Sequence, residues 1–409
     1  MNDKLFYVDI SRNLSISYQD FFHDLSSDED YNSICESPDI YILLRSLAHS
    51  IINDQALTII DRLDSNQPSN IIDKQFFSSN DRSIDVRSKL DSINRDLLNL
   101  RNWSLSLYSS GTTGSPKKIT HDITTISKGL KVSDKHRNDV WGLAYNPSHI
   151  AGVQVFLQAF LNGNTIIRLF NLDNKQVSET MSENKVTHIS ATPTFYRLML
   201  PSLNDPHQSM IRVTAGGEKL NQELRDQLAT TFSNAKLTNV YASTELGSLL
   251  ASENETFCIN KKDNGKIKID DGQLYVNSKE LASIHSSTSI ENWYATGDLV
   301  EIISKNPTTF KFIGRTGDLV NVGGYNVNLS SIEDSLLEIE NVIDARVFAQ
   351  KSSLIGNLIC ADVVVQNETI ETGEITEYLN KKHHDHEIPR IIKFVDKIEH
   401  TRTGKKART

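Results

Sequence analysis

The chain has 409 residues, of which 38% are hydrophobic and 23% charged, and its formal net charge is −9. This length allows two or three domains with a sizeable core, and the acidic balance argues against general binding to nucleic acid. The three cysteines show no CxxC spacing, and their odd number favours a reducing compartment. No window approaches the roughly 18 apolar residues of a membrane span, and the N-terminus lacks a signal-peptide pattern. The sequence therefore predicts a cytoplasmic protein without a membrane span.

The first hundred residues are the least informative. Residues 41–63 are consistent with a helix followed by a strand, and the polar residues 65–95 are expected to begin as a surface loop. From residue 103 onward, predicted strands alternate with helical segments such as residues 150–161. The predicted strands are residues 103–108, 139–145, 165–170, 187–193, 210–217 and 237–243. This alternation is typical of parallel sheets, which bind ligands beyond the carboxyl ends of their strands.

The pattern changes after residue 243 to short strands separated by Gly and Asp turns, which predicts an antiparallel subdomain. A composition shift near residues 314–318 marks a domain boundary. The predicted fold class is therefore α/β: a large N-terminal domain with parallel sheets and a small antiparallel subdomain, followed by a small α+β domain. We expect the domains to span residues 1–314 and 315–409.

The strongest local signal is the segment YSSGTTGSPKK at residues 108–118. Its glycines allow a tight turn whose amide groups point at phosphate oxygens, its hydroxyls add donors, and a lysine adds charge. It is not a Walker A loop, because Pro116 precedes Lys117 and another lysine follows. The candidate phosphate-binding residues are Ser109, Ser110, Gly111, Thr112, Thr113, Gly114 and Lys117.

The segment SSGTTGSPKK resembles the phosphate loop of the acyl-adenylate-forming superfamily, which includes acyl- and aryl-CoA ligases, luciferases and the adenylation domains of peptide synthetases. Four further motifs of that family recur in the expected order. They are YASTE at 241–245, YATGDL at 294–299, GRTGDLVNVGGYNVN at 314–328 and TGKKAR at 403–408. The resemblance covers about residues 103–409, and the part before the phosphate loop is shorter than usual for the family.

The resemblance assigns nucleotide and metal contacts to the YASTE motif and the phosphate loop. By this match, Tyr241 stacks on adenine, Thr244 contacts the α-phosphate and Glu245 holds Mg²⁺ together with Thr112 or Thr113. A carboxylate near phosphates suits this hard, oxygen-seeking cation. Ala242 stands where the family usually has glycine, which narrows the space beside the nucleotide or acyl group.

The ribose contacts follow from the next two motifs. Asp298 is expected to accept hydrogen bonds from both ribose hydroxyls, with Arg315 assisting. The family's usual Asp or Lys at the hinge between the domains is replaced here by Gly317, which tolerates large φ/ψ changes.

The last motifs supply the mobile parts of the family mechanism. The adenylation lysine corresponds to Lys405, and Lys406 is the alternative assignment. The turn at Gly323 and Gly324 is expected to line the approach of the thiol after the small C-terminal domain rotates as a lid.

The segment NPSHIAGV at 146–153 resembles the His-x-x-Gly segment of aryl- and acyl-CoA ligases, and the likeness to o-succinylbenzoate–CoA ligases is the closest. It places His149 where the acyl pocket meets the thiol tunnel. Gly216, Gly217 and Glu218 are expected to flank adenine and the acyl group. Small and apolar residues are expected to line the pocket and to suit an aromatic or short acyl group. These residues are Ile150, Val153, Ala191, Ala215 and Ala242.

The resemblance implies an ATP- and Mg²⁺-dependent ligase that converts a small-molecule carboxylic acid to its acyl-adenylate and then to a coenzyme A thioester. One alternative replaces coenzyme A by the phosphopantetheine arm of an acyl carrier protein. A second is a degenerate, non-catalytic nucleotide-binding protein. The acid is not identified, and a monomer or a homodimer fits equally.

The histidine-rich segment KKHHDHE at 381–387 resembles a metal motif at first sight. No second cluster of ligand residues accompanies it in the sequence. We therefore expect His383, His384 and His386 to form the exposed end of a helix.

Overall fold

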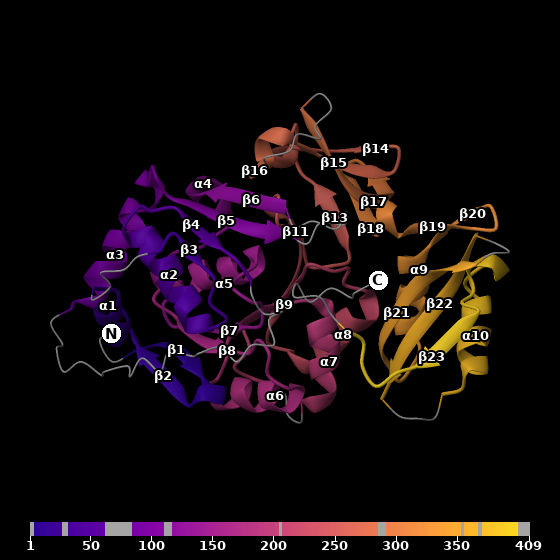
Figure 1. Cartoon of the computed structure of the whole chain (residues 1–409), viewed down its shortest axis with the longest axis horizontal. Helices are drawn as coiled ribbons and strands as arrows, with labels where there is room; N and C mark the ends of the chain where they lie inside the picture. The colour runs from indigo at the N-terminus through magenta and orange to yellow at the C-terminus, as the bar shows by residue number, and fades with distance from the viewer. Residues whose placement is uncertain are drawn as a thin grey trace.

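The computed structural model describes residues 4–26, 32–61, 84–109, 117–203, 207–284, 292–352, 356–366 and 370–399. Within these ranges the chain forms a large, mainly parallel sheet, a mixed parallel and antiparallel sheet, an antiparallel sheet, and a C-terminal hairpin with a three-stranded sheet (Figure 1). This arrangement confirms the predicted fold class. None of the helices in these ranges is long and apolar enough to cross a membrane.

The largest sheet has the strand order β12-β11-β10-β9-β7-β8-β1-β2. Its edge strands β2 (Leu14–Ser17) and β12 (Gly247–Ser252) are antiparallel to their neighbours, and all other pairs are parallel. The parallel strands are β1 (Leu5–Asp9), β7 (Val140–Leu143), β8 (Thr165–Arg168), β9 (His188–Ala191), β10 (Arg212–Gly216) and β11 (Lys236–Ser243). Their carboxyl ends meet at one edge, which is where such sheets bind ligands.

Helices cover both faces of this sheet because successive strand residues point to opposite sides. Ile166 belongs to the hydrophobic core on one face and Ile167 to the core on the other. The first face carries α1 (Tyr18–Ser26), α2 (Ile40–Ile52), α3 (Val86–Asp96) and α5 (Ile150–Leu161). The second face carries α6 (Asn174–Glu183), α7 (Pro193–Met199) and α8 (Gln222–Thr231). The helix expected at 150–161 is thus present with the predicted bounds.

A second sheet has the order β16-β6-β5-β4-β3 and shares a core with α2, α3 and α5. Its strands are β3 (Ile34–Cys35), β4 (Leu57–Ile59), β5 (Ser104–Ser109), β6 (Lys117–Asp122) and β16 (Ser283–Ile284). The short helix α4 (Ile123–Ile126) follows β6. Sequence patterns predicted neither β6 nor the N-terminal hairpin of β1 and β2.

The antiparallel subdomain is confirmed as a five-stranded sheet in the order β13-β18-β17-β15-β14. Its strands are β13 (Thr256–Ile259), β14 (Ile267–Asp270), β15 (Gln273–Asn277), β17 (Trp293–Lys305) and β18 (Thr308–Arg315). Figure 1 shows it above the carboxyl ends of the parallel strands, beside the C-terminal region.

The C-terminal region has a hydrophobic core of its own, which begins with Val322. It contains the hairpin β19 (Leu319–Val322) and β20 (Tyr325–Asn328), the sheet β21 (Val342–Ser352), β22 (Gly356–Val365) and β23 (Ile391–Phe394), and the helices α9 (Leu329–Leu337) and α10 (Thr372–Asn380). It lies next to α7 and α8 (Figure 1), and an ion pair of 2.5 Å joins Lys219 Nζ to Asp334 Oδ2.

Candidate active site

Three separated motifs converge at the end of β11. The hydroxyl of Tyr241 donates to Asp298 Oδ2 at 2.5 Å, and Arg315 Nε lies 2.8 Å from Asp298 Oδ1. Asp298 and Arg315 are direct partners in the register of β17 and β18. The Asp298 side chain is only 13% exposed, whereas the Arg315 side chain is 46% exposed, so the guanidinium reaches the carboxylate from the solvent side. The predicted ribose residues are thus brought together.

The Tyr241 ring is fixed on one face by Phe312, with ring centroids 4.6 Å apart and an interplanar angle of 24°. Burial raises the pKa of the Tyr241 hydroxyl well above its ordinary value, and the Asp298 carboxylate raises it further. The hydroxyl therefore stays protonated at neutral pH and acts as a donor. Its predicted stacking on adenine remains a prediction.

The backbone around Asp298 is held by its own motif. The amide of Asp298 donates to Thr296 Oγ1 at 3.1 Å, and Arg315 Nη2 donates to the Thr296 carbonyl at 3.1 Å. Gly297 between them has φ +78°, and a Cβ there would lie 3.3 Å from Thr316 Oγ1. This position favours glycine on both counts, which explains the Thr-Gly-Asp spacing.

The predicted metal-binding carboxylate lies in the turn between β11 and β12. Glu245 is half-buried, its backbone carbonyl accepts from Ala282 N at 2.8 Å, and its carboxylate forms no ion pair with another described residue. A carboxylate without a protein counter-charge suits a divalent cation. Thr244, beside it, lines the cavity described below.

His121 on β6 is a neighbour of this turn that sequence reasoning missed. Its ring is fully buried, and burial lowers its pKa, whereas the Thr244 backbone and the Asp122 and Glu245 charges raise it. The sequence signal that could have identified His121 is the T-H-D segment shortly after the predicted phosphate loop. His121 therefore lies beside the Tyr241–Glu245 motif, on the strand that follows the predicted phosphate loop.

The ends of the predicted phosphate loop are adjacent, because Ser109 on β5 pairs with Lys117 on β6 in antiparallel register. Lys117 is exposed. The loop between them and the C-terminal lysines lie outside the described residues. The predicted site residues affected are Ser110, Gly111, Thr112, Thr113, Gly114 and Lys405.

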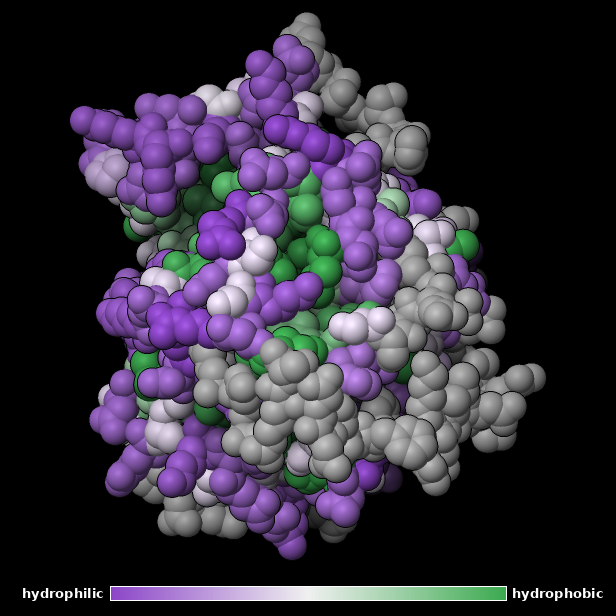
Figure 2. Space-filling model, turned by 90° about the vertical axis from the view of Figure 1, so that its left-hand side faces the viewer, coloured by the Kyte–Doolittle hydropathy of each residue, from purple (hydrophilic) through white to green (hydrophobic). Residues whose placement is uncertain are grey.

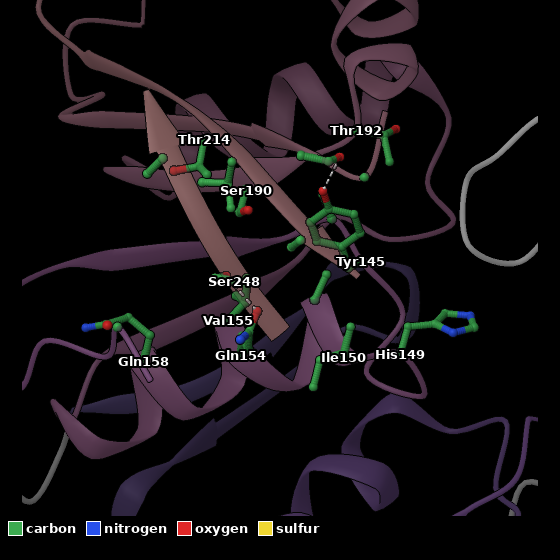
Figure 3. A pocket seen from close by; sticks show the side chains of 18 of the residues that line it. Tyr145, His149, Ile150, Gln154, Val155, Gln158, Ser190, Thr192, Thr214 and Ser248 are labelled. Carbon is green, nitrogen blue, oxygen red and sulfur yellow. Dashed lines mark hydrogen bonds between the residues drawn. The ribbon is translucent and has the colours of Figure 1, made fainter. Parts of the chain in front are cut away.

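A cavity of about 990 Å³ lies between α5 and the large sheet (Figure 3). One wall is formed by α5, from which Ile150, Gln154 and Gln158 face the cavity at helical spacing. The facing strands contribute small or polar residues at alternating positions. These residues are Ser190, Thr192, Thr214, Gly216 and Ala242.

The lining differs from the expected one at three positions. Ala191 and Ala215 point to the opposite face, where they join the core with α6 to α8, and Val153 is fully buried in the core on the other side of α5. The reason is the two-residue period of strands, which turns Ser190 and Thr214 toward the cavity instead. The cavity is therefore more polar than predicted, whereas Ile150 and Ala242 line it as expected.

His149 is the N-cap residue of α5 and lies at the edge of this cavity. Its ring points away from Ser190 and Thr214 (Figure 3), and its Nε2 lies 3.7 Å from Asp61 Oδ2. Three residues on, a Cβ at Gly152 would lie 2.4 Å from the Asn146 carbonyl oxygen. Only glycine allows α5 to approach the preceding loop this closely, which accounts for the His-x-x-Gly spacing.

The residues at the end of β10 line the cavity and also accept hydrogen bonds from neighbouring segments. The hydroxyl of Tyr145 donates to the Gly216 carbonyl at 3.0 Å, and Gly217 lines the cavity with φ +85°. Glu218 instead accepts from Thr194 N at 3.1 Å and from Thr194 Oγ1 at 2.7 Å, at the start of α7. Its predicted contact with the nucleotide remains a prediction.

The predicted thiol-lining glycines lie in the exposed turn of the β19–β20 hairpin. Gly323 and Gly324 have φ +58° and +95°, and the Gly324 amide donates to Asn321 Oδ1 at 3.1 Å. The turn does not line the cavity.

The chain is similar to known proteins over most of its length. A family model described as AMP-binding enzyme matches residues 34–271, and a second, described as AMP-binding enzyme C-terminal domain, matches residues 331–405. Bacitracin synthase 3 of Bacillus licheniformis is 24% identical over 346 residues, which cover 73% of this chain and only 5% of that protein. The 2-succinylbenzoate–CoA ligase of Listeria monocytogenes is 24% identical over 333 residues, covering 75% of this chain and 70% of that protein.

Among solved structures, the O-succinylbenzoate coenzyme A synthetase from Bacillus subtilis, in complex with ATP and magnesium ion, has a TM-score of 0.66 at 15% identity. The match covers 99% of this chain and 96% of that one. At this identity the likeness shows a shared fold.

Proposed function

This chain belongs to the AMP-binding enzyme family, and from this premise we propose that it is an AMP-forming ligase that activates a carboxylic acid with ATP. In the first step a carboxylate oxygen attacks the α-phosphorus, the bond to the β-phosphate breaks, and pyrophosphate leaves. In the second step the sulfur of coenzyme A attacks the acyl carbonyl carbon, and AMP leaves. The products are a thioester, AMP and pyrophosphate.

The observation that supports this proposal best is the convergence of Tyr241, Asp298 and Arg315 next to the cavity that Ala242 and Thr244 line. The Asp298 carboxylate has about four acceptor sites. Two are used by Tyr241 and Arg315 at 2.5 and 2.8 Å, which leaves acceptor capacity for the two ribose hydroxyls. A nucleotide held there has its phosphates beside Thr244 and Glu245, and the acyl cavity begins at Gly216 and Ala242.

The chemical difficulty of the first step is charge. Carboxylate and ATP repel each other, so the site must orient them and neutralise the charge that develops at the α-phosphate. We assign this task to the loop from Ser109 to Lys117, which holds the phosphates, and to Lys405, which reaches the α-phosphate and the substrate carboxylate. Mg²⁺, held by Glu245 with Thr112 or Thr113, would supply further positive charge.

The second step requires that the thiol occupy the position that Lys405 leaves. We infer that residues 315–409 form a lid that rotates about Gly317 and brings Gly323 and Gly324 toward the acyl carbonyl. His149, at the N-terminus of α5 and the edge of the cavity, would then border the path of the thiol.

Two versions of this function differ in the thiol that accepts the acyl group. Similarity to 2-succinylbenzoate–CoA ligase supports free coenzyme A, whereas similarity to bacitracin synthase 3 supports a carrier-protein phosphopantetheine arm. We favour coenzyme A, since the match covers most of the ligase and one-twentieth of the synthase. Incubating preformed acyl-adenylate with either acceptor, and measuring thioester, separates them.

The test of adenylation is exchange of labelled pyrophosphate into ATP, screened across aryl, fatty and amino acids without coenzyme A. We expect at least one acid to stimulate exchange well above the acid-free rate. If no acid does so while the protein still binds ATP, the chain is a non-catalytic nucleotide-binding protein and the proposal fails.

If the acyl group binds in the cavity, enlarging a lining residue should slow exchange more for large acids than for small ones. Replacing Thr214 by Phe puts a ring on the cavity side of β10, so we expect exchange with the largest active acid to fall about tenfold or more, while the smallest is affected much less. Thr230→Phe, on the exposed face of α8, serves as the matched control. Equal losses for large and small acids would show that the acyl group binds elsewhere.

A further inference from the structure

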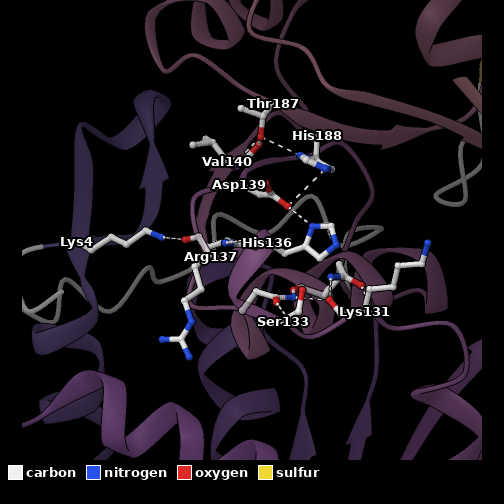
Figure 4. A network of polar contacts seen from close by, with 12 residues as sticks. Lys4, Lys131, Ser133, His136, Arg137, Asp139, Val140, Thr187 and His188 are labelled. Atoms are coloured by element: carbon white, nitrogen blue, oxygen red, sulfur yellow. Dashed lines mark hydrogen bonds and ion pairs between the residues drawn. The ribbon is translucent and has the colours of Figure 1, made fainter. Parts of the chain in front are cut away.

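Three potential metal ligands meet at the start of β9, and the proposed adenylation mechanism assigns none of them a role. His136 Nδ1 lies 3.0 Å and His188 Nε2 3.5 Å from the same oxygen, Asp139 Oδ2 (Figure 4). The three ligand atoms all lie within 4.8 Å of one another, and they form the one such group among the described residues. His136 and His188 also line the cavity.

The strands hold two of these side chains rigidly. Asp139 directly precedes β7 and is 7% exposed, and His188 begins β9 and is 4% exposed. The His188 ring packs against Trp141, its register partner on β7, with ring centroids 4.9 Å apart. His136 comes from the short turn before β7 and is half-buried.

The orientation of the His188 ring follows from its other nitrogen. Thr187 Oγ1 accepts from Val140 N at 2.8 Å and can donate its single proton to the Val140 carbonyl at 3.1 Å. The 2.9 Å contact between Thr187 Oγ1 and His188 Nδ1 fits either tautomer of the histidine. In the tautomer that can bind a metal, Nδ1 donates to the threonine oxygen and the lone pair of Nε2 faces Asp139 Oδ2.

We propose that His136, Asp139 and His188 form a Zn²⁺ site whose fourth position opens into the cavity. Zn²⁺ bonds of 2.0–2.1 Å in a tetrahedron place the ligand atoms about 3.3–3.4 Å apart, and the observed 3.0 and 3.5 Å bracket that spacing. A charge-assisted hydrogen bond between imidazolium and carboxylate would draw Nε2 to about 2.7–2.9 Å, closer than it lies. Thr187 Oγ1 would then be the outer hydrogen-bond partner that fixes the orientation of the His188 ring.

The types of ligand atom select the kind of metal. Two cations lie near the site, Arg212 as the register partner of His188 on β10, and Lys4 close enough to Asp139 for their charges to interact. Lys4 Nζ donates to the Arg137 carbonyl at 2.5 Å, and Arg212 Nη1 donates to Thr238 Oγ1 at 3.3 Å. A site built from two nitrogens and one carboxylate disfavours Mg²⁺ and Ca²⁺, which need several oxygen ligands, and suits Zn²⁺.

The test uses tag-free full-length protein and Zn²⁺ alone, so it is independent of the proposed ligase activity. We expect one Zn²⁺ per chain by elemental analysis after dialysis against trace Zn²⁺, and a tetrahedral Co²⁺ absorption band after substitution. Asp139→Asn should weaken binding by at least about 100-fold, and Thr187→Val, which leaves all three ligands in place, by about 10- to 100-fold. His136→Ala, at the half-buried position, provides a second ligand variant if Asp139→Asn fails to fold.

His384→Ala, at an exposed position of the histidine-rich segment in the C-terminal region, is the matched control and should keep full Zn²⁺ content. Wild-type protein that holds no more Zn²⁺ than Asp139→Asn or His136→Ala would overturn the proposal. Loss of Zn²⁺ in His384→Ala alone would move the site to the C-terminal histidines and equally overturn it.

Discussion

Replacing Lys405 by alanine is expected to remove adenylate formation from ATP while leaving thioester formation from added acyl-adenylate nearly intact. The reason is that the ammonium group is needed where negative charge develops at the α-phosphate, and the second step must proceed after it has left. Loss of one such transition-state contact typically lowers kcat by about 10²–10³-fold. Pyrophosphate exchange measures the first step, and thioester formation from synthetic acyl-AMP measures the second.

Lys406→Ala is the matched control, because it removes a neighbouring charge from the same segment. We expect it to retain exchange. If Lys406→Ala loses exchange and Lys405→Ala does not, the catalytic role belongs to Lys406. If both retain it, the C-terminal segment has no part in adenylation. If Lys405→Ala loses both half-reactions equally, the lysine serves binding or folding instead.

The fold could be predicted wherever a local pattern determines it. Strands such as β10 and helices such as α5 are apolar runs bounded by turn residues, so their positions follow from the chain itself. β6 was missed because it is a short mixed strand whose place depends on pairing with β5 and β16. The hairpin of β1 and β2 likewise depends on β8, more than 150 residues away.

The candidate site also contains parts that could be predicted from the sequence and parts that could not. The Tyr241, Asp298 and Arg315 motifs were recognised by resemblance, and the structure places them in contact. The lining of the cavity was partly wrong, because the sequence does not say which of two adjacent strand residues faces α5. The cluster of His136, Asp139 and His188 was missed because one ligand lies about 50 residues from the others and only the parallel pairing of β7 with β9 joins them.

Replacing Asp298 by alanine is expected to reduce kcat/KM for ATP by about 10²-fold or more, chiefly through a raised KM. The change removes the acceptors proposed for both ribose hydroxyls. It also leaves the partly buried Tyr241 hydroxyl without its carboxylate partner, which costs about 1–3 kcal/mol, whereas the exposed Arg315 guanidinium is solvated by water instead. Steady-state exchange at varied ATP, with direct measurement of ATP binding, checks this.

Tyr241→Phe separates the two roles of that carboxylate. It removes only the hydroxyl and keeps the ring against Phe312, so it frees Asp298 Oδ2 without removing it. We expect ATP binding to weaken much less than in Asp298→Ala. Asp270→Asn, in the same antiparallel sheet but exposed, controls for loss of one negative charge.

A result in which Tyr241→Phe is as damaging as Asp298→Ala would mean that the hydroxyl, rather than the carboxylate, meets the nucleotide. A result in which Asp298→Ala binds ATP normally would remove the ribose from this position altogether. The site would then lose the contact that orients the phosphates toward Thr244 and Glu245, and the nucleotide would have to enter from another side of the cavity.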